Sequence, residues 1–475
     1  MEKYVIGDVR RQRTMMAVVC FGALMANMDG TIVNVCLPTI ANGWNLSPSY
    51  ASLIVLAYLL FETGPIMAFG KLGDLFGGRR VFLGGFVLFT AASLLCGMSG
   101  TFWQLVAMRM LQGIGGSMMF SVMLTFAAIH VPLAKRGRAM GYTTMAAALG
   151  VAIGPPVGGI IAHYLGWRHI FFINVPLGLI AMLVGFRVLP KTYPAPRDSR
   201  FDTLGAVYQT LFLLAFVFAL NQGAELGWTS PLIAGSLVCS VVIAALFVRR
   251  ELRIDYPILD LRLFANRDTL FSTLNFCLSM MVFGGILFIF PFYLQDIRNM
   301  TVNIIGLVMC VLSVGQFLGP YAGQLGDRKG HKSIALAGVG FGLVAFTMFT
   351  LMDYGEPLWW VVLALTVFGL SQGLNRAPNI QLIMGSVSVE RKNTAASLTS
   401  LMRSLGLVLG VVVFETTFSR FIPDSLSLDA VSLKHSGISP ERLHEGFEVT
   451  LLVGLAISVL MVALIAAVRG APKAE

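Results

Sequence analysis

Apolar stretches of about twenty residues recur along the whole chain, and they limit the possible fold more than any other feature. A helix needs ~20 residues to cross ~30 Å of hydrocarbon. In lipid only helices and closed barrels satisfy their backbone polar groups, and barrel strands alternate apolar and polar residues instead of running continuously apolar. The sequence therefore predicts an all-α membrane protein with fourteen transmembrane helices. The expected spans are 14–40, 50–70, 81–99, 102–126, 139–163, 169–189, 203–221, 231–248, 269–293, 303–323, 333–352, 358–383, 395–419 and 447–469.

Composition agrees with a chain surrounded mostly by lipid. Hydrophobic residues make up 56% of the 475 residues and charged residues only 12%, against ~25% charged in soluble domains. The net charge of +10 does not indicate nucleic-acid binding, because the basic residues lie in short loops between spans. The six cysteines lie in apolar segments without metal-ligand spacing, so no metal site is expected. The expected surroundings are the lipid bilayer.

Basic residues fall on alternate loops, which predicts the orientation of the chain. Cytoplasmic loops carry an excess of Lys and Arg. We therefore expect both termini in the cytoplasm. The clusters lie at 10–13, 71–80, 135–138, 191–200, 249–262, 328–332 and 391–392.

An internal repeat divides the chain into two similar parts. Residues 70–80 and 323–332 each contain Gly-x-x-x-Asp followed by basic residues. Two spans further on, Gln112-Gly113 is matched by Gln372-Gly373. Repeated halves around a site near the midplane are a common transporter architecture. We predict a 6+2+6 arrangement: an N-terminal six-helix half at 1–190, two inserted helices with a linker at 191–267, and a C-terminal six-helix half at 268–475.

Several further motifs carry a family resemblance. Span 1 reads D-G-T-I-V-N-V-C-L-P over 29–38, with Cys36 where alanine is usual, and span 4 reads R-M-L-Q-G-I-G over 109–115. Span 5 reads G-V-A-I-G-P-P-V-G-G over 150–159, and Asn-Val-Pro follows at 174–176. Together with the first loop repeat, these motifs resemble the major facilitator superfamily, and within it the fourteen-span drug:proton antiporters.

The resemblance implies a major facilitator fold and a proton-coupled antiporter that exports hydrophobic, often cationic, small molecules by alternating access. It also implies a monomer in the bacterial cytoplasmic (inner) membrane, driven by the proton gradient without a cofactor. Two alternatives remain: a dedicated exporter of one metabolite or antibiotic, and a non-transporting receptor or assembly partner. No complete phosphate-binding loop, His-Glu-x-x-His or Gly-x-Ser-x-Gly is present, so we expect no catalytic residues and no enzyme.

Three ionisable residues inside spans are candidates for proton coupling. Asp29 and Arg109 lie at similar depths when counted at ~1.5 Å per residue, and buried ionisable groups usually face a cavity or a proton path. The two residues either exchange protons as a pair or form a structural ion pair. Glu62, near the middle of span 2, has three open roles: attracting a cationic substrate, binding a second proton, or hydrogen-bonding a neighbouring helix.

Two elements are candidates for a conformational switch. The first motif loop joins Asp74 to the nearby basic side chains Arg79 and Arg80. The resemblance implies a cytoplasmic latch, in which Asp74 contacts a helix end and basic residues of the other half when the protein opens outward. Asp327 is the weaker counterpart, and the alternative is topology control alone. In span 5, small residues one turn apart permit close helix packing, and prolines favour a bend. The span-5 residues concerned are Gly150, Gly154, Pro155 and Gly158.

Cavity residues are expected among the aromatic, methionine and polar side chains of several spans. Arg376 is expected near the cytoplasmic end of its span, where a long cationic side chain can extend to the interface; Arg403 lies in a similar place. Glu415 and Asp296 are expected to be solvated groups at the opposite edge. The predicted cavity residues are Tyr58, Phe61, Glu62, Met108, Gln112, Phe276, Phe283, Phe288 and Arg403.

Overall fold

The computed structural model is helical throughout its described part, which comprises residues 8–132, 136–190, 202–254, 257, 259, 261–352, 356–387, 392–421 and 440–469. Among these residues, 13 helices are long and apolar enough to cross a membrane. Each predicted span falls on a helix, so the all-α class is confirmed. The N-terminal helices are α1 (Val9–Trp44), α2 (Pro48–Thr63), α3 (Ile66–Phe76), α4 (Gly78–Gly97), α5 (Phe102–His130), α6 (Arg136–Leu165), α7 (His169–Phe172) and α8 (Asn174–Val188).

The remaining helices follow the same pattern. Helices α9 (Thr203–Leu226) and α10 (Pro231–Glu251) come next in the chain. The C-terminal helices are α11 (Arg267–Phe292), α12 (Val302–Gln316), α13 (Gly319–Lys329), α14 (His331–Thr350), α15 (Leu358–Gly385), α16 (Lys392–Ser419) and α18 (Pro440–Ala467).

The sequence repeat corresponds to a structural repeat. The predicted span 50–70 is the pair α2 and α3, interrupted at Gly64 and Pro65, and 303–323 is the pair α12 and α13. Short helices α3 and α13 both end at a glycine with positive φ, 94° at Gly77 and 93° at Gly330. Glycine adopts this conformation without a steric penalty. Both repeat loops therefore reverse the chain in the same way, at one end of the bundle, which we call the motif-loop end.

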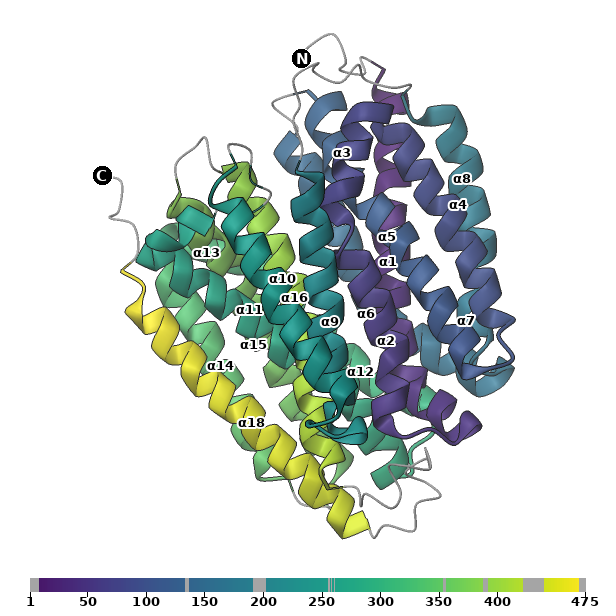
Figure 1. Cartoon of the computed structure of the whole chain (residues 1–475), viewed down its shortest axis with the longest axis vertical. Helices are drawn as coiled ribbons and strands as arrows, with labels where there is room; N and C mark the ends of the chain where they lie inside the picture. Colours follow the sequence, from purple (N-terminus) through teal and green to yellow (C-terminus); the bar gives the residue numbers. More distant parts are fainter. Residues whose placement is uncertain are drawn as a thin grey trace.

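Helices α1 to α8 lie together and α11 to α18 lie together, with α9 and α10 beside them (Figure 1). In the first group α1 packs along α6, and α5 packs on α2 and α4; in the second α11 packs along α16, and α15 packs on α12 and α14. Helix α9 contacts both α2 and α16 and so connects the groups. We call the groups the N-half and the C-half.

The glycine ladder of α6 faces α1. A Cβ atom added at Gly150 would lie 2.3 Å from the carbonyl oxygen of Leu24, and one at Gly158 would lie 2.5 Å from a side-chain carbon of Ile32. Gly154 is equally close to α1, with Thr31 Oγ1 at 2.1 Å. The small residues thus let the two helix backbones approach closely. Pro155 and Pro156 lie inside α6, which continues through both.

Direct contacts between the halves gather at the end opposite the motif loops. There Thr39 donates to Gln295 (2.9 Å) and Asn42 donates to Asp296 (3.0 Å). At the crossing of α6 and α12, a Cβ added at Gly306 would lie 2.3 Å from the carbonyl oxygen of Pro155. In Figure 1 the two halves converge towards the end remote from both chain termini.

The expectation of a solvated acid at this end is wrong for Glu415. Glu415 is only 1% exposed; its carboxylate accepts from Asn221 of α9 (3.3 Å) and from Ser419 (2.6 Å). Asp296 is half-buried and accepts from Asn42 of the other half. Buried polar groups need hydrogen-bond partners, and the packing of the halves supplies them.

Candidate functional site

A buried polar network connects four helices of the N-half, α1, α4, α5 and α8. Arg109 Nη1 on α5 lies 2.5 Å from Asp29 Oδ2 on α1. Gln112 and Asn174 donate to the other carboxylate oxygen, Oδ1, at 2.9 and 2.6 Å. Gln112 also accepts from Arg109 (2.7 Å) and donates to Ser93 (2.7 Å). Four members of the network are 0% exposed: Asp29, Arg109, Gln112 and Asn174. Their polar groups therefore contact one another and not solvent.

The ion pair has further partners, although Arg109 Nη2 is buried without a hydrogen-bond partner among the described residues. Removing two charges from water is costly unless further hydrogen bonds satisfy them. Arg109 Nε donates to the carbonyl oxygen of Ile54 (3.3 Å), and its guanidinium carbon lies 4.3 Å from the ring centroid of Tyr58. Asp29 and Arg109 therefore form a geometric pair; whether they also move protons stays a prediction.

Asn174 is a member of the network that our sequence analysis missed. In the sequence it stands only within the Asn-Val-Pro motif, which assigns it no role. The available signal was an amide inside the membrane region, at the first residue of α8. Gln112, predicted to line a cavity, instead belongs to this network.

A central pocket lies between the halves. Its lining comes from α1, α2 and α6 on one side and α11, α12, α15 and α16 on the other, and its volume is about 280 Å³. This size is close to the lower end of small-ligand pockets, ~300 Å³. Tyr58 lines the pocket while its ring also contacts Arg109, so one side chain connects the pocket with the buried network.

The predicted cavity residues divide into two groups. Among the lining residues of the central pocket are Tyr58, Glu62, Phe276, Phe283 and Arg403. Phe61 and Met108 instead pack against the hydrophobic core, and Phe288 is fully buried within it.

Arg376 does not extend to the interface as expected but lines the central pocket. Arg403, one of the predicted cavity residues, lines the same pocket. Arg376 Nη1 donates to Gln316 Oε1 (2.9 Å), and its guanidinium carbon lies 4.3 Å from the ring centroid of Phe283. Arg403 Nη2 lies 3.5 Å from Asn27 Oδ1 of the N-half. The sequence specified their depth, whereas the rotation of α15 and α16 about their axes directs both side chains inwards.

The predicted switch residues are only partly visible. Arg79 donates to the carbonyl oxygen of Phe186, and Arg80 is exposed. Asp327 lies 3.2 Å from His331 one turn later. Asp74 lies on α3, but its side chain is outside the described part of the chain. The latch therefore stays a prediction.

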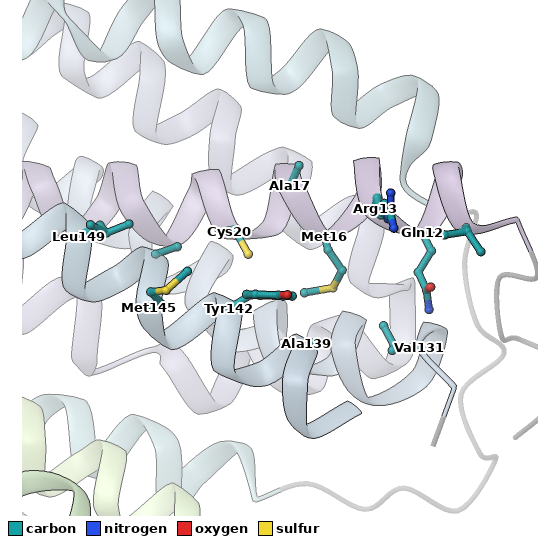
Figure 2. A pocket seen from close by; sticks show the side chains of 12 residues that line it. Gln12, Arg13, Met16, Ala17, Cys20, Val131, Ala139, Tyr142, Met145 and Leu149 are labelled. Carbon is teal, nitrogen blue, oxygen red and sulfur yellow. The ribbon is translucent and has the colours of Figure 1, made fainter. Parts of the chain in front are cut away.

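A second hollow lies at the motif-loop end between α1 and α6 (Figure 2). Met16 and Cys20 from α1 and Tyr142 and Met145 from α6 reach into the space between the two helices. Its volume is about 460 Å³, and Arg13 is the charged residue in its lining. None of the predicted cavity residues lines it, and it is separate from the buried network.

Two repeated helical halves around a pocket with charged residues are typical of a membrane transporter for small molecules. Comparison with known proteins identifies the family. Residues 19–411 match the Major Facilitator Superfamily, and the chain belongs to it. The protein is therefore a multi-pass membrane transporter and not an enzyme.

Three relatives are a named transporter and two resistance proteins. The riboflavin transporter RibZ of Clostridioides difficile is 31% identical over 87% of this chain and 89% of its own. The methylenomycin A resistance protein of Bacillus subtilis is 28% identical over 84% and 86%. The multidrug resistance protein Stp of Mycobacterium tuberculosis (strain H37Rv) is 29% identical over 85% and 75%.

Solved structures confirm the fold expected from the resemblance. A bacterial homologue of the human lysosomal transporter Spinster, in an inward-facing conformation, matches with a TM-score of 0.66 and 15% identity, covering 98% of this chain and 100% of that one. A peptide transporter POT in complex with sulfate has a TM-score of 0.67 and 14% identity, covering 96% and 94%. At these identities the likeness concerns the fold alone.

Proposed function

We propose that this transporter is a proton-coupled antiporter that exports hydrophobic small molecules by alternating access. The observation that carries the proposal is the fully buried Asp29–Arg109 pair, joined to the central pocket through the ring of Tyr58. A carboxyl group inside a membrane protein is costly and usually serves a proton or ion path. Protonating Asp29 would remove the charge–charge attraction that holds Arg109, so proton uptake can loosen a contact between α1 and α5.

Substrate and proton can compete through this connection. A molecule in the central pocket lies against Tyr58, whose ring covers the Arg109 guanidinium. Displacing that ring changes the surroundings of the ion pair and thus the affinity of Asp29 for a proton. Such reciprocal coupling between two sites is what an antiporter requires. Glu62 lies in the pocket lining and is the second candidate proton site.

The names of relatives support export of drug-like compounds. Two relatives carry resistance in their names, and we extend export to this chain. The aromatic lining and Met280 suit a pocket that adapts to several ligands. The similarity to a riboflavin transporter favours the alternative, a transporter dedicated to one metabolite. A narrow substrate range would distinguish that alternative.

Alternating access also accounts for the gathering of contacts at one end. If the positive-inside pattern sets the orientation, the motif-loop end faces the cytoplasm and the converging end faces outwards. The present arrangement is then inward-facing: it is closed to the outside, and substrate would enter the central pocket from the cytoplasm. Export would require the α6–α12 crossing to separate.

The direct test of coupling is substrate-driven proton movement in proteoliposomes. With a pH-sensitive dye inside, we expect a steady pH change when ethidium, a quaternary ammonium compound or riboflavin is added to vesicles holding the native protein. Empty vesicles and vesicles with added protonophore are the controls. Transport of any of these compounds without proton movement would contradict the antiporter proposal.

Gly306→Leu is expected to shift the protein towards the outward-open state. Its Cβ would meet Pro155 of the other half, and overpacking at such a contact costs ~1–3 kcal/mol, equivalent to a population shift of roughly 5- to 150-fold. The reporter is Val302→Cys, a buried position at this crossing, in a background without the natural cysteines. Labelling by an impermeant maleimide from outside should accelerate by that factor.

Gly338→Leu is the matched control for this experiment. Its Cβ would crowd Asn375 at 2.6 Å, but both residues lie within the C-half. It should disturb packing without separating the halves. Equal acceleration by both variants would mean that general loosening, not separation at the crossing, exposes Val302→Cys.

A further inference from the structure

Arg376 carries unused hydrogen-bond donors inside the central pocket. Nη1 donates to Gln316, but Nε and Nη2 are buried and have no partner among the described residues; neither has Gln316 Nε2. A buried donor without an acceptor is unfavourable, because it has lost its hydrogen bonds to water and forms none with the protein. An acceptor group delivered by a ligand would remove this penalty.

The charges around the pocket do not provide that acceptor. Its lining contains two arginines, Arg376 and Arg403, and one acid, Glu62, so the net charge of the lining is +1 even with Glu62 ionised. No carboxylate among the described residues lies within 4.0 Å of Arg376 or Arg403. The nearby Asp29–Arg109 pair is neutral as a unit. In a confined site such an excess favours a negatively charged guest.

The surroundings of Arg376 also suit a flat ligand. Its guanidinium lies 4.3 Å from the centre of the Phe283 ring, an arrangement that holds the planar group in place. The planar guanidinium of arginine can donate two parallel hydrogen bonds to a planar acceptor with two oxygens, whereas the ammonium group of a lysine acts as a point charge. Phe276 and Tyr58 supply further ring surface in the same lining, where an apolar body can pack.

We propose that the central pocket selects small aromatic or alicyclic compounds bearing one planar anionic group, such as a carboxylate, and that Arg376 binds this group. The proposal rests on the proposed function only in taking the central pocket as the substrate site. It narrows the substrate class from hydrophobic compounds in general to hydrophobic anions. Gln316 orients Arg376, and Phe283 supports its face.

Binding of three matched probes tests the selection. Naphthalene-2-carboxylate, naphthalene-2-carboxamide and 2-naphthylmethylammonium share a body and differ in charge. Titration calorimetry on the full chain in nanodiscs should give at least ~10-fold tighter binding of the carboxylate than of either other probe, because charge-assisted bidentate hydrogen bonds are stronger than neutral ones. Tightest binding of the ammonium probe, or no binding of any probe, would overturn the proposal.

Variants assign the effect to Arg376. Arg376→Gln should reduce the carboxylate-to-carboxamide preference to about one, and Arg376→Lys should keep part of it, because the charge remains without the fork. Arg249→Gln removes an exposed arginine of α10 that does not line the pocket, and it should keep the full preference. A full preference in a folded Arg376→Gln variant would refute the role of Arg376; if that variant does not fold, an unreduced preference in Arg376→Lys would do so.

The experiment is separable from the test of proton coupling. Binding is measured without a proton gradient, so it does not depend on Asp29 exchanging protons. Carboxylate selectivity without any proton movement in vesicles would refute the antiporter proposal and leave the anion site standing. Proton movement driven by ethidium, combined with tightest binding of the ammonium probe, would refute the anion site and leave the antiporter proposal standing.

Discussion

Asp29→Asn should abolish substrate-driven proton movement. The coupled proton flux should fall by at least ~100-fold, which corresponds to ~2.7 kcal/mol in activation free energy. The asparagine is nearly isosteric, and its oxygen can still accept from Arg109, Gln112 or Asn174, the present partners of Asp29. It cannot take up and release a proton. The variant should still bind substrate, because Asp29 does not line the central pocket, but its affinity should fall by the roughly 5- to 150-fold that coupling to a protonated Asp29 would impose.

The measurement is the dye assay in proteoliposomes, together with a binding titration of the same preparation. Glu445→Gln is the matched control, because it neutralises an exposed acid on α18 far from the network; it should retain native coupling. Native proton flux in Asp29→Asn would show that Asp29 is only a structural partner of Arg109, and the proposed proton path would have to be abandoned.

Arg109→Met should destabilise the fold by about 3–5 kcal/mol, because it leaves the carboxylate of Asp29 buried without its 2.5 Å partner. Adding Asp29→Asn to this variant should recover more than half of the loss, since the remaining amide can bond to Gln112 and Asn174. The effects of two residues in direct contact are not additive. The free energy of unfolding would be measured by denaturant titration in mixed micelles.

Arg249→Met provides the comparison for stability. This arginine is exposed on α10, and surface substitutions usually change stability by no more than about 0.5 kcal/mol. If Arg109→Met costs no more than Arg249→Met, the buried pair contributes nothing to the fold. A double variant as unstable as the sum of its parts would mean that Asp29 and Arg109 act independently despite their contact.

The helices were predictable because lipid imposes a simple requirement. A continuous apolar stretch of about twenty residues has one favourable structure in a membrane, so even the interrupted span at Gly64 and Pro65 was placed correctly. The repeated Gly-x-x-x-Asp loops also predicted matching structures, which end at Gly77 and Gly330 with the same positive φ. Local composition was sufficient for these elements. The domain boundaries and the orientation of the chain stay predictions.

The site was predictable only in part. Counting residues placed Asp29 and Arg109 at a similar depth, and the structure joins them. Counting cannot specify the direction in which a side chain points around its helix axis. For this reason Arg376 was expected at the interface but lines the central pocket, and Glu415 was expected in water but is buried against α9.

The sequence by itself determined the class of protein, the helical spans and the residues whose charge is costly in a membrane, because each depends on the composition of a short segment. The tertiary structure alone decided which of these residues meet. Asn174 reaches Asp29 across 145 positions of sequence, and Arg403 approaches Asn27 across 376. Such contacts depend on the packing and rotation of whole helices, which many distant side chains determine together.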